Sequence, residues 1–210
     1  MSYILRIDSS PRLEGSHSRR IANAIESGLR RANPDLLVRR RDLAAVNIPH
    51  ITNEAVTGFY TPDDQMTPEL RAATALSDEL IAELKGAEVL LISTPMYNFG
   101  VPSTLKAWID QIVRINQTFA FDGAAFTGLV PVRKAFLALA YGASGYTDGA
   151  PFSPMNFLEP YLVSLMGFLG IADTQVFRLE GAAGPEPMLI AQSHDAIADD
   201  ITQSMAMAGA

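Results

Sequence analysis

Short runs of apolar residues alternate along the chain with longer segments in which apolar positions recur every three or four residues. The short runs predict strands buried on both faces, and the longer segments predict amphipathic helices. Strands are predicted at 3–8, 36–41, 89–94, 134–140 and 174–179, and helices at 18–32, 68–85, 103–116, 157–170 and 188–207. This alternation predicts an α/β fold with a doubly wound, five-stranded parallel sheet in the order 2-1-3-4-5 and helices on both faces.

One segment does not fit this pattern. Residues 49–67 are long for a loop in a compact domain, and loops of this length are usually lids, binding loops or partner contacts. A surface excursion without a role explains the segment equally well. Both interpretations stay open at this stage.

Composition supports one domain over residues 1–210. Of the 210 residues, 48% are hydrophobic, and no repeat or Pro/Gly-rich linker divides the chain. Arg6 interrupts the first apolar stretch, which is not typical of a signal peptide, and the most apolar later segment, 162–172, is about half the length of a membrane span. We therefore expect a soluble, cytoplasmic protein.

Charge and cysteine content exclude several classes of function. Sixteen basic and 23 acidic residues give a net charge of −7, which argues against binding to nucleic acid or to an anionic membrane. The absence of cysteine excludes disulfides, thiolate nucleophiles, Cys-ligated zinc and iron–sulfur clusters. Chemistry must come from hydroxyls, amides, carboxylates, three histidines or a bound cofactor.

The loop after the first strand is rich in hydroxyl groups and leads directly into a helix. Ser10, Ser16 and Ser18 surround Gly15 there, and the amide groups and dipole of a helix start favour a phosphate. A helix-capping role for Ser16 or Ser18 is the simpler alternative. The loop matches neither the P-loop nor the dinucleotide-binding glycine pattern, so a terminal phosphate monoester fits better.

Two further loops follow central strands, where ligands of such sheets bind. Tyr97, Asn98 and Phe99 place two rings and an amide after the third strand, and residues 141–146 are mostly small residues that allow close backbone approach. Each loop is weak evidence by itself. Together, a phosphate cradle, an aromatic shelf and a small-residue loop describe a site for flavin mononucleotide (FMN).

These residues also carry a family resemblance that extends over essentially the whole chain. The most specific segments are the Ser9–Ser18 loop and Met96-Tyr97-Asn98-Phe99, followed by Pro102-Ser103-Thr104-Leu105-Lys106. The chain resembles the FMN-dependent NADH:azoreductase and NAD(P)H quinone reductase family, whose fold is flavodoxin-like. Departures from the family pattern occur at Gly100, at 115–117 and in the 143–145 loop, and they bear on substrate preference.

The resemblance implies a set of site residues. Those expected to hold the FMN phosphate are Ser10, Ser16, His17 and Ser18, and those expected around the flavin ring and its side chain are Met96, Tyr97, Asn98, Phe99, Tyr141, Gly142, Ala143 and Ser144. Phe121 and Phe168 match aromatic positions near the substrate pocket. The family is homodimeric, with its sites at the subunit interface.

The expected reaction transfers a hydride from NADH or NADPH, through N5 of the flavin, to a quinone or an aromatic azo compound with ping-pong kinetics. No protein residue is assigned as catalytic and no metal is expected. The alternatives are a flavodoxin-type electron carrier without its own substrate turnover and, less well supported, a phosphate-binding regulatory module.

Two histidines and a run of three arginines have interpretations that do not involve catalysis. His50 and His194 are expected on the surface. Residues 39–41 are three consecutive arginines, which indicate either an anion-binding patch or a charged edge strand.

Overall fold

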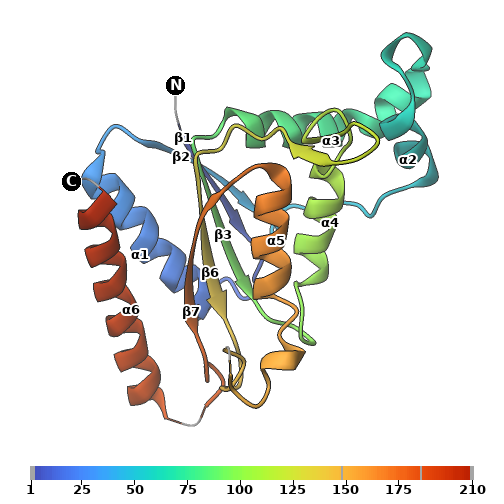
Figure 1. Cartoon of the computed structure of the whole chain (residues 1–210). Helices are drawn as coiled ribbons and strands as arrows, with labels where there is room; N and C mark the ends of the chain where they lie inside the picture. Colours follow the sequence, from blue (N-terminus) through green and yellow to red (C-terminus); the bar gives the residue numbers. More distant parts are fainter. Residues whose placement is uncertain (1–2, 148, 185, 209–210) are drawn as a thin grey trace.

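A five-stranded parallel sheet forms the centre of the computed structural model, which describes residues 3–147, 149–184 and 186–208 (Figure 1). Its strands lie in the order β2-β1-β3-β6-β7, which confirms the predicted 2-1-3-4-5 order. Their bounds are Leu37–Asp42 for β2, Tyr3–Asp8 for β1, Val89–Pro95 for β3, Lys134–Ala140 for β6 and Asp173–Leu179 for β7. The carboxyl ends of β1, β3 and β6 therefore meet at one edge of the sheet.

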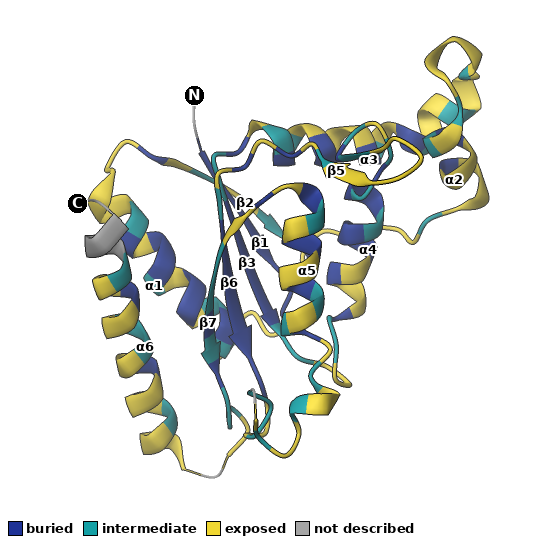
Figure 2. Ribbon diagram, viewed as in Figure 1, coloured by how far each residue is buried: buried dark blue, intermediate teal, exposed yellow. Residues whose placement is uncertain are grey.

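Helices cover both faces of the sheet, as predicted. Helices α1 (His17–Ala32) and α6 (Pro187–Ala208) pack together on one face, and α3 (Pro68–Gly86), α4 (Ser103–Ile112) and α5 (Glu159–Leu169) cover the other. Figure 2 shows the central strands buried and the outer sides of the helices exposed. The fold is flavodoxin-like, with a separate apolar core on each side of the sheet.

The 49–67 segment contains a helix that its sequence did not indicate. Helix α2 spans Asn53–Tyr60, and a 3-10 turn, η1, follows at Asp63–Gln65. The side chain of Thr52 caps α2 by accepting a hydrogen bond of 3.2 Å from the amide of Ala55. A Cβ at Gly58 would lie 2.6 Å from Cγ2 of Thr74, so this glycine permits α2 to pack closely on α3. The expectation of an irregular loop here was wrong.

A second unpredicted element is a hairpin of two very short strands, β4 (Phe119–Phe121) and β5 (Phe126–Gly128). It is attached to the end of α5 by the close approach of two glycines: a Cβ at Gly128 would lie only 2.1 Å from the amide nitrogen of Gly170. Gly170 itself has a φ of 96°, which favours glycine, and it ends α5.

Helix α4 ends earlier than predicted, at Ile112 rather than 116. The hydroxyl of Thr118 donates a hydrogen bond of 2.7 Å to the carbonyl of Ile112 and accepts one of 2.9 Å from the amide of Arg114. These bonds replace the next helical turn, and Asn116 takes a φ of 60°. Within the described part of the chain, none of the helices combines the length and the apolar character required to cross a bilayer.

Candidate cofactor site

A cavity of about 160 Å³ opens at the carboxyl edge of the sheet, between the loops that follow β1, β3, β6 and β7. Strand register brings these loops together, because Asp8 pairs with Ser93, and Pro95 pairs with Ala140. The residues that line the cavity are Ser10, Arg12, Gly15, Ser16, His17, Ser18, Pro95, Met96, Tyr97, Ala140, Gly142, Ala182 and Ala183. The cavity therefore collects residues from all three loops that sequence reasoning singled out.

The phosphate end of this cavity is built from the β1–α1 loop. Ser16 is the N-cap of α1, and its Oγ accepts from the amide of Arg19 at 3.5 Å and lies 3.3 Å from Oγ of Ser18. The capping role and the cavity-lining position thus belong to the same residue. The first amide groups of a helix have no partner within it, so those at the start of α1 are available to an anion.

Arg19 braces this loop from behind. Its guanidinium donates two hydrogen bonds of 2.7 Å to the carboxylate of Asp42 and one of 2.8 Å to the backbone carbonyl of Ser10. The hydrogen bond from Arg19 lowers the pKa of Asp42, so this carboxylate stays charged. The ion pair ties β2 to the loop and fixes the position of Ser10.

The aromatic shelf is a tight turn with an uncommon backbone. Tyr97 and Gly100 exchange two backbone hydrogen bonds of 3.0 and 3.1 Å, and the two central residues, Asn98 and Phe99, have φ values of 47° and 71°. Positive φ values at both central positions define a type I′ turn, which is unusual for phenylalanine. The turn leaves the side chains of all three residues exposed, but it does not bring all three to the cavity. Tyr97 lines both the cavity and a second hollow beside α4, Asn98 lines only that hollow, and Phe99 lines neither.

The loop after β6 is held by a carboxylate. Glu180 accepts hydrogen bonds of 3.1 Å from the amide of Gly145 and 2.8 Å from the amide of Tyr146. Gly142 lines the cavity, and Ser144 lines a separate hollow beside α6. Ala143 is exposed and accepts a hydrogen bond from the amide of Gly181 at 3.2 Å.

Tyr141 is held in the core instead of pointing to the cavity. Its side chain is 1% exposed, and its hydroxyl lies 3.3 Å from Oε2 of Glu159. Burial raises the pKa of Tyr141, and the charge of Glu159 raises it further. Its backbone amide donates to Leu179 and its carbonyl accepts from Ala182, so Tyr141 supports the loop through its packing.

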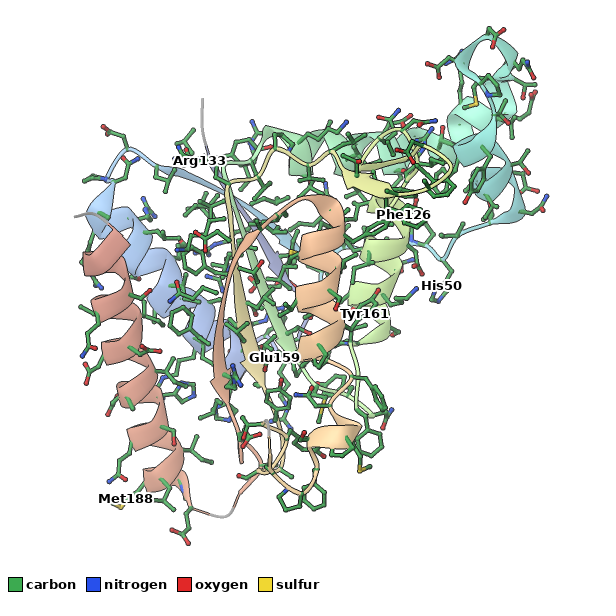
Figure 3. The ribbon with its side chains drawn as sticks, viewed as in Figure 1. His50, Phe126, Arg133, Glu159, Tyr161 and Met188 are labelled. Carbon is green, nitrogen blue, oxygen red and sulfur yellow. The ribbon has the colours of Figure 1, made fainter. Side chains whose placement is uncertain are left out.

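Phe121 and Phe168 lie together but far from this cavity within one chain. Both contact Phe126, with ring centroids 4.7 and 5.5 Å apart, in a cluster that also includes Phe119. Helix α5 begins near the cavity edge at Glu159 and ends beside this cluster, about 15 Å further on at about 1.5 Å per residue. Figure 3 shows Phe126 and Glu159 at opposite ends of the helix.

His194 corrects a prediction, because it is 4% exposed and not on the surface. Its Nε2 lies 2.9 Å from Nδ1 of His17, across the contact between α6 and α1. The sequence does indicate this buried position, because His194 follows Ile190 by four residues and precedes Ile197 by three. The three residues therefore share the face of α6 that packs inward. His50, by contrast, is exposed as expected (Figure 3).

The predicted site residues omit six that line the cavity: Arg12, Gly15, Pro95, Ala140, Ala182 and Ala183. Arg12 adds a positive charge. Ala182 and Ala183 belong to the loop after β7, where the flanking residues Glu180-Gly181 and Gly184-Pro185-Glu186 share the family resemblance but gave no site residue. The arginines of β2 favour the charged-edge interpretation, because Arg40 pairs with Glu26 at 2.7 Å and Arg41 pairs with Glu83 at 2.7 Å. The part of the chain that the structure describes contains no cluster of metal-ligating side chains.

The residues of the cavity fit FMN. One end offers serine hydroxyls, a helix start and Arg12 to a phosphate, and Gly15 (φ 66°) has open space where a Cβ would point. The other end combines the exposed ring of Tyr97 with the small residues Gly142 and Ala183. A flat heterocycle can therefore lie against the ring and approach the backbone.

Comparison with known proteins agrees with this geometry. A family model described as "Flavodoxin-like fold" matches residues 2–201. An FMN-dependent NADH:quinone oxidoreductase of Xanthobacter autotrophicus is 53% identical over 176 residues, which cover 84% of this chain and 85% of that protein. The chain therefore belongs to the flavodoxin-like family, and within it to the group that contains the FMN-dependent NADH:quinone oxidoreductases.

Further similarities are consistent with this placement. An FMN-dependent NAD(P)H:quinone oxidoreductase 1 of Pseudomonas aeruginosa is 41% identical over 186 residues, covering 86% of this chain and 88% of that protein. The crystal structure of an FMN-dependent NADH-azoreductase from Bacillus anthracis in complex with FMN superposes with a TM-score of 0.85, at 22% identity, and covers both chains completely. At that identity the superposition supports the fold.

Proposed function

We propose that this protein is an FMN-dependent oxidoreductase that uses NADH or NADPH to reduce quinones and aromatic azo compounds. The observation that carries the proposal is the cavity at the carboxyl edge of the sheet, which is lined both by the serines and helix start of the phosphate cradle and by Tyr97 of the aromatic shelf. The names of the relatives and structural neighbours support the cofactor and both substrate classes. Because NADH and NADPH are cytoplasmic reductants, we place the activity in the cytoplasm.

Each part of the cavity has a distinct task in this proposal. When bound, FMN supplies reversible two-electron redox chemistry. Ser10, Ser16, His17 and Ser18 bind the phosphate, with Arg12 beside them. Met96 and Tyr97, which line the cavity, orient the flavin ring together with Asn98 and Phe99 of the same turn. The main chain around Gly142 and Ala143 approaches the edge of the ring, with Tyr141 and Ser144 supporting that loop. The protein positions the reactants and supplies no nucleophile.

We further propose that the working unit is a homodimer. Phe126 is 60% exposed and Phe121 is 47% exposed, and contiguous aromatic surface of this kind usually marks an interaction site. In a homodimer with sites at the interface, Phe121 and Phe168 of one copy would wall the substrate pocket of the other. Phe126→Ser should then convert a dimer into a monomer in light scattering after size-exclusion chromatography.

The experiment that tests the proposed function begins with the colour and redox response of the purified protein. We expect the protein to retain or take up FMN, NADH to bleach its yellow colour without oxygen, and a naphthoquinone to restore the colour. Steady-state rates with a panel of quinones and azo dyes should give parallel double-reciprocal lines for each nicotinamide.

Three outcomes would contradict the proposal in different ways. A colourless protein that takes up no FMN would exclude a flavin protein. A yellow protein that NADH does not bleach would indicate a flavodoxin-type carrier. Rapid bleaching without reoxidation by any quinone or azo dye would show that the acceptor class is wrong.

A further inference from the structure

Two histidines from distant parts of the sequence meet at the phosphate end of the cavity. His17 is the first residue of α1 and lines the cavity, whereas His194 lies on α6 behind it. The Nδ1 atom of His17 and the Nε2 atom of His194 are 2.9 Å apart, and the two ring planes are inclined by 17°. This is a hydrogen bond of ordinary length, so one proton lies between the two nitrogens.

That single contact limits the protonation states of His17. If both rings are neutral and His17 donates from Nδ1, its Nε2 has a lone pair and repels an anion. If His194 donates instead, Nε2 of His17 carries a proton and can bind an anion. If His17 is fully protonated, Nδ1–H binds His194 and Nε2–H remains for the anion, and the added positive charge strengthens that contact.

The surroundings of the pair keep it neutral in the absence of an anion. Burial, Arg20 and Arg12 lower the pKa of His17, and burial, Arg20 and His17 lower the pKa of His194 to about 4. Asp195 of α6 opposes these effects weakly at His194. A further positive charge on either ring is therefore disfavoured until an anion binds.

Three acidic groups at this edge of the sheet, Asp42, Asp8 and Glu180, are already engaged by other partners. Asp42 pairs with Arg19 at 2.7 Å, and Asp8 lies 3.0 Å from Arg6. Glu180 accepts its hydrogen bonds from the backbone of the 141–146 loop. Among the residues that the structure describes, the hydrogen-bond partner of each imidazole is the other imidazole. The negative charge that would stabilise a protonated pair is therefore expected from a ligand.

We propose that His17 and His194 act together as a proton-binding unit that couples cofactor binding to proton uptake. The phosphate of the cofactor binds beside His17, which then takes up one proton from solvent. His194 is the positioning residue: its Nε2 accepts the Nδ1–H of His17 and thereby directs the Nε2–H of His17 to the phosphate. The inference rests on the proposed function, because it requires FMN in this cavity.

The sign of the pH dependence follows from this coupling. A dianion beside His17 raises its pKa in the complex above that in the flavin-free protein. The contribution of this proton to affinity is present in full below the pKa of the free state and is lost as pH rises through the pKa of the complex. The phosphate of FMN titrates at about pH 6, so proton uptake measured at about pH 7.5 and above comes from groups of the protein.

Isothermal titration calorimetry of the full-length, flavin-free protein tests the proposal. Titrations in buffers with different enthalpies of ionisation give the number of protons taken up for each FMN bound. At about pH 7.5 we expect uptake of at least about 0.3 proton with FMN and none with riboflavin, which lacks the phosphate. His17→Gln should abolish the uptake, because glutamine cannot carry the proton, and His194→Leu should reduce it, because leucine cannot accept the Nδ1–H of His17. His50→Gln, at an exposed histidine outside the cavity, should retain it.

A second measurement on the holoprotein keeps the test decisive if His194→Leu fails to fold. Long-range proton–nitrogen NMR spectra should show both ring nitrogens of His17 protonated in the FMN complex at about pH 7.5, where free histidine is neutral. FMN binding without proton uptake, uptake that persists in His17→Gln, or a neutral His17 ring in the complex would overturn the inference while leaving the proposed function intact. Failure to bind FMN at all would overturn both.

Discussion

Arg19 and Asp42 face each other through two hydrogen bonds of 2.7 Å, and the same guanidinium holds the carbonyl of Ser10 at 2.8 Å. The pair therefore links the edge strand β2 to the loop that lines the phosphate end of the cavity. Since the guanidinium fork makes three directed bonds, a single ammonium group cannot replace it.

Arg19→Lys should weaken FMN binding and reduce stability together. We expect the free energy of unfolding to fall by about 1–3 kcal/mol, as for hydrogen bonds to charged groups, and FMN to dissociate more readily because Ser10 is no longer held. Urea unfolding and fluorescence titration with FMN measure the two effects. Arg30→Lys, at an exposed position of α1, is the matched control and should change neither.

Asp42 should make the protein sensitive to acid. The hydrogen bond from Arg19 lowers the pKa of Asp42 in the folded state, so its contribution to stability is present above the unfolded value of about 4 and is lost as pH falls below it. Urea unfolding between about pH 7 and about pH 3 should show a smaller loss of stability in Asp42→Asn than in the unaltered protein. Equal losses of stability in the two proteins would show that Asp42 does not contribute to the sensitivity to acid.

Asn98 can be tested without disturbing the turn that carries it. Its φ of 47° suits glycine but not alanine, so Asn98→Gly removes the amide and preserves the type I′ turn. If the amide is paired with the flavin ring, FMN binding should weaken by about 1–3 kcal/mol with little change in unfolding. Unchanged affinity would place the edge of the flavin elsewhere.

The contact between Gly128 and Gly170 should be essential for attaching the β4–β5 hairpin. Gly128→Ala places a Cβ 2.1 Å from a backbone nitrogen, and we expect a loss of about 3 kcal/mol or more in the free energy of unfolding. Gly167→Ala is the matched control on α5, where nothing lies within 4 Å of the added Cβ, and it should stabilise by about 0.5–1 kcal/mol. Differential scanning calorimetry compares the two variants.

The sheet order and the long helices were predictable because their apolar patterns extend over many residues. The hairpin was not, since its two strands of three residues are too short to show alternation. Helix α2 has only eight residues, and its packing depends on a contact between Gly58 and Thr74 that is distant in sequence. The early end of α4 depends likewise on one hydroxyl, that of Thr118.

The candidate site was predictable to a similar degree. Loops that follow adjacent parallel strands must meet, so the sequence alone suffices to bring Ser16, Met96 and Gly142 together. The inward orientation of the Tyr141 side chain depends on how the loops pack against the sheet. The contact between His17 and His194 depends on how α6 packs there. The spacing of His194 from Ile190 and Ile197 does carry a signal for an inward position, although it does not indicate the partner.

The cavity draws its walls from both ends of the chain, with Ser16 from the start of the first helix and Ala182 and Ala183 from the loop after the last strand. During synthesis, the nascent chain therefore carries an incomplete site until the loop that follows β7 has left the ribosome. FMN can then bind firmly only to a chain in which β7 has joined the sheet, so the cofactor stabilises molecules with all five strands in place over molecules truncated before β7.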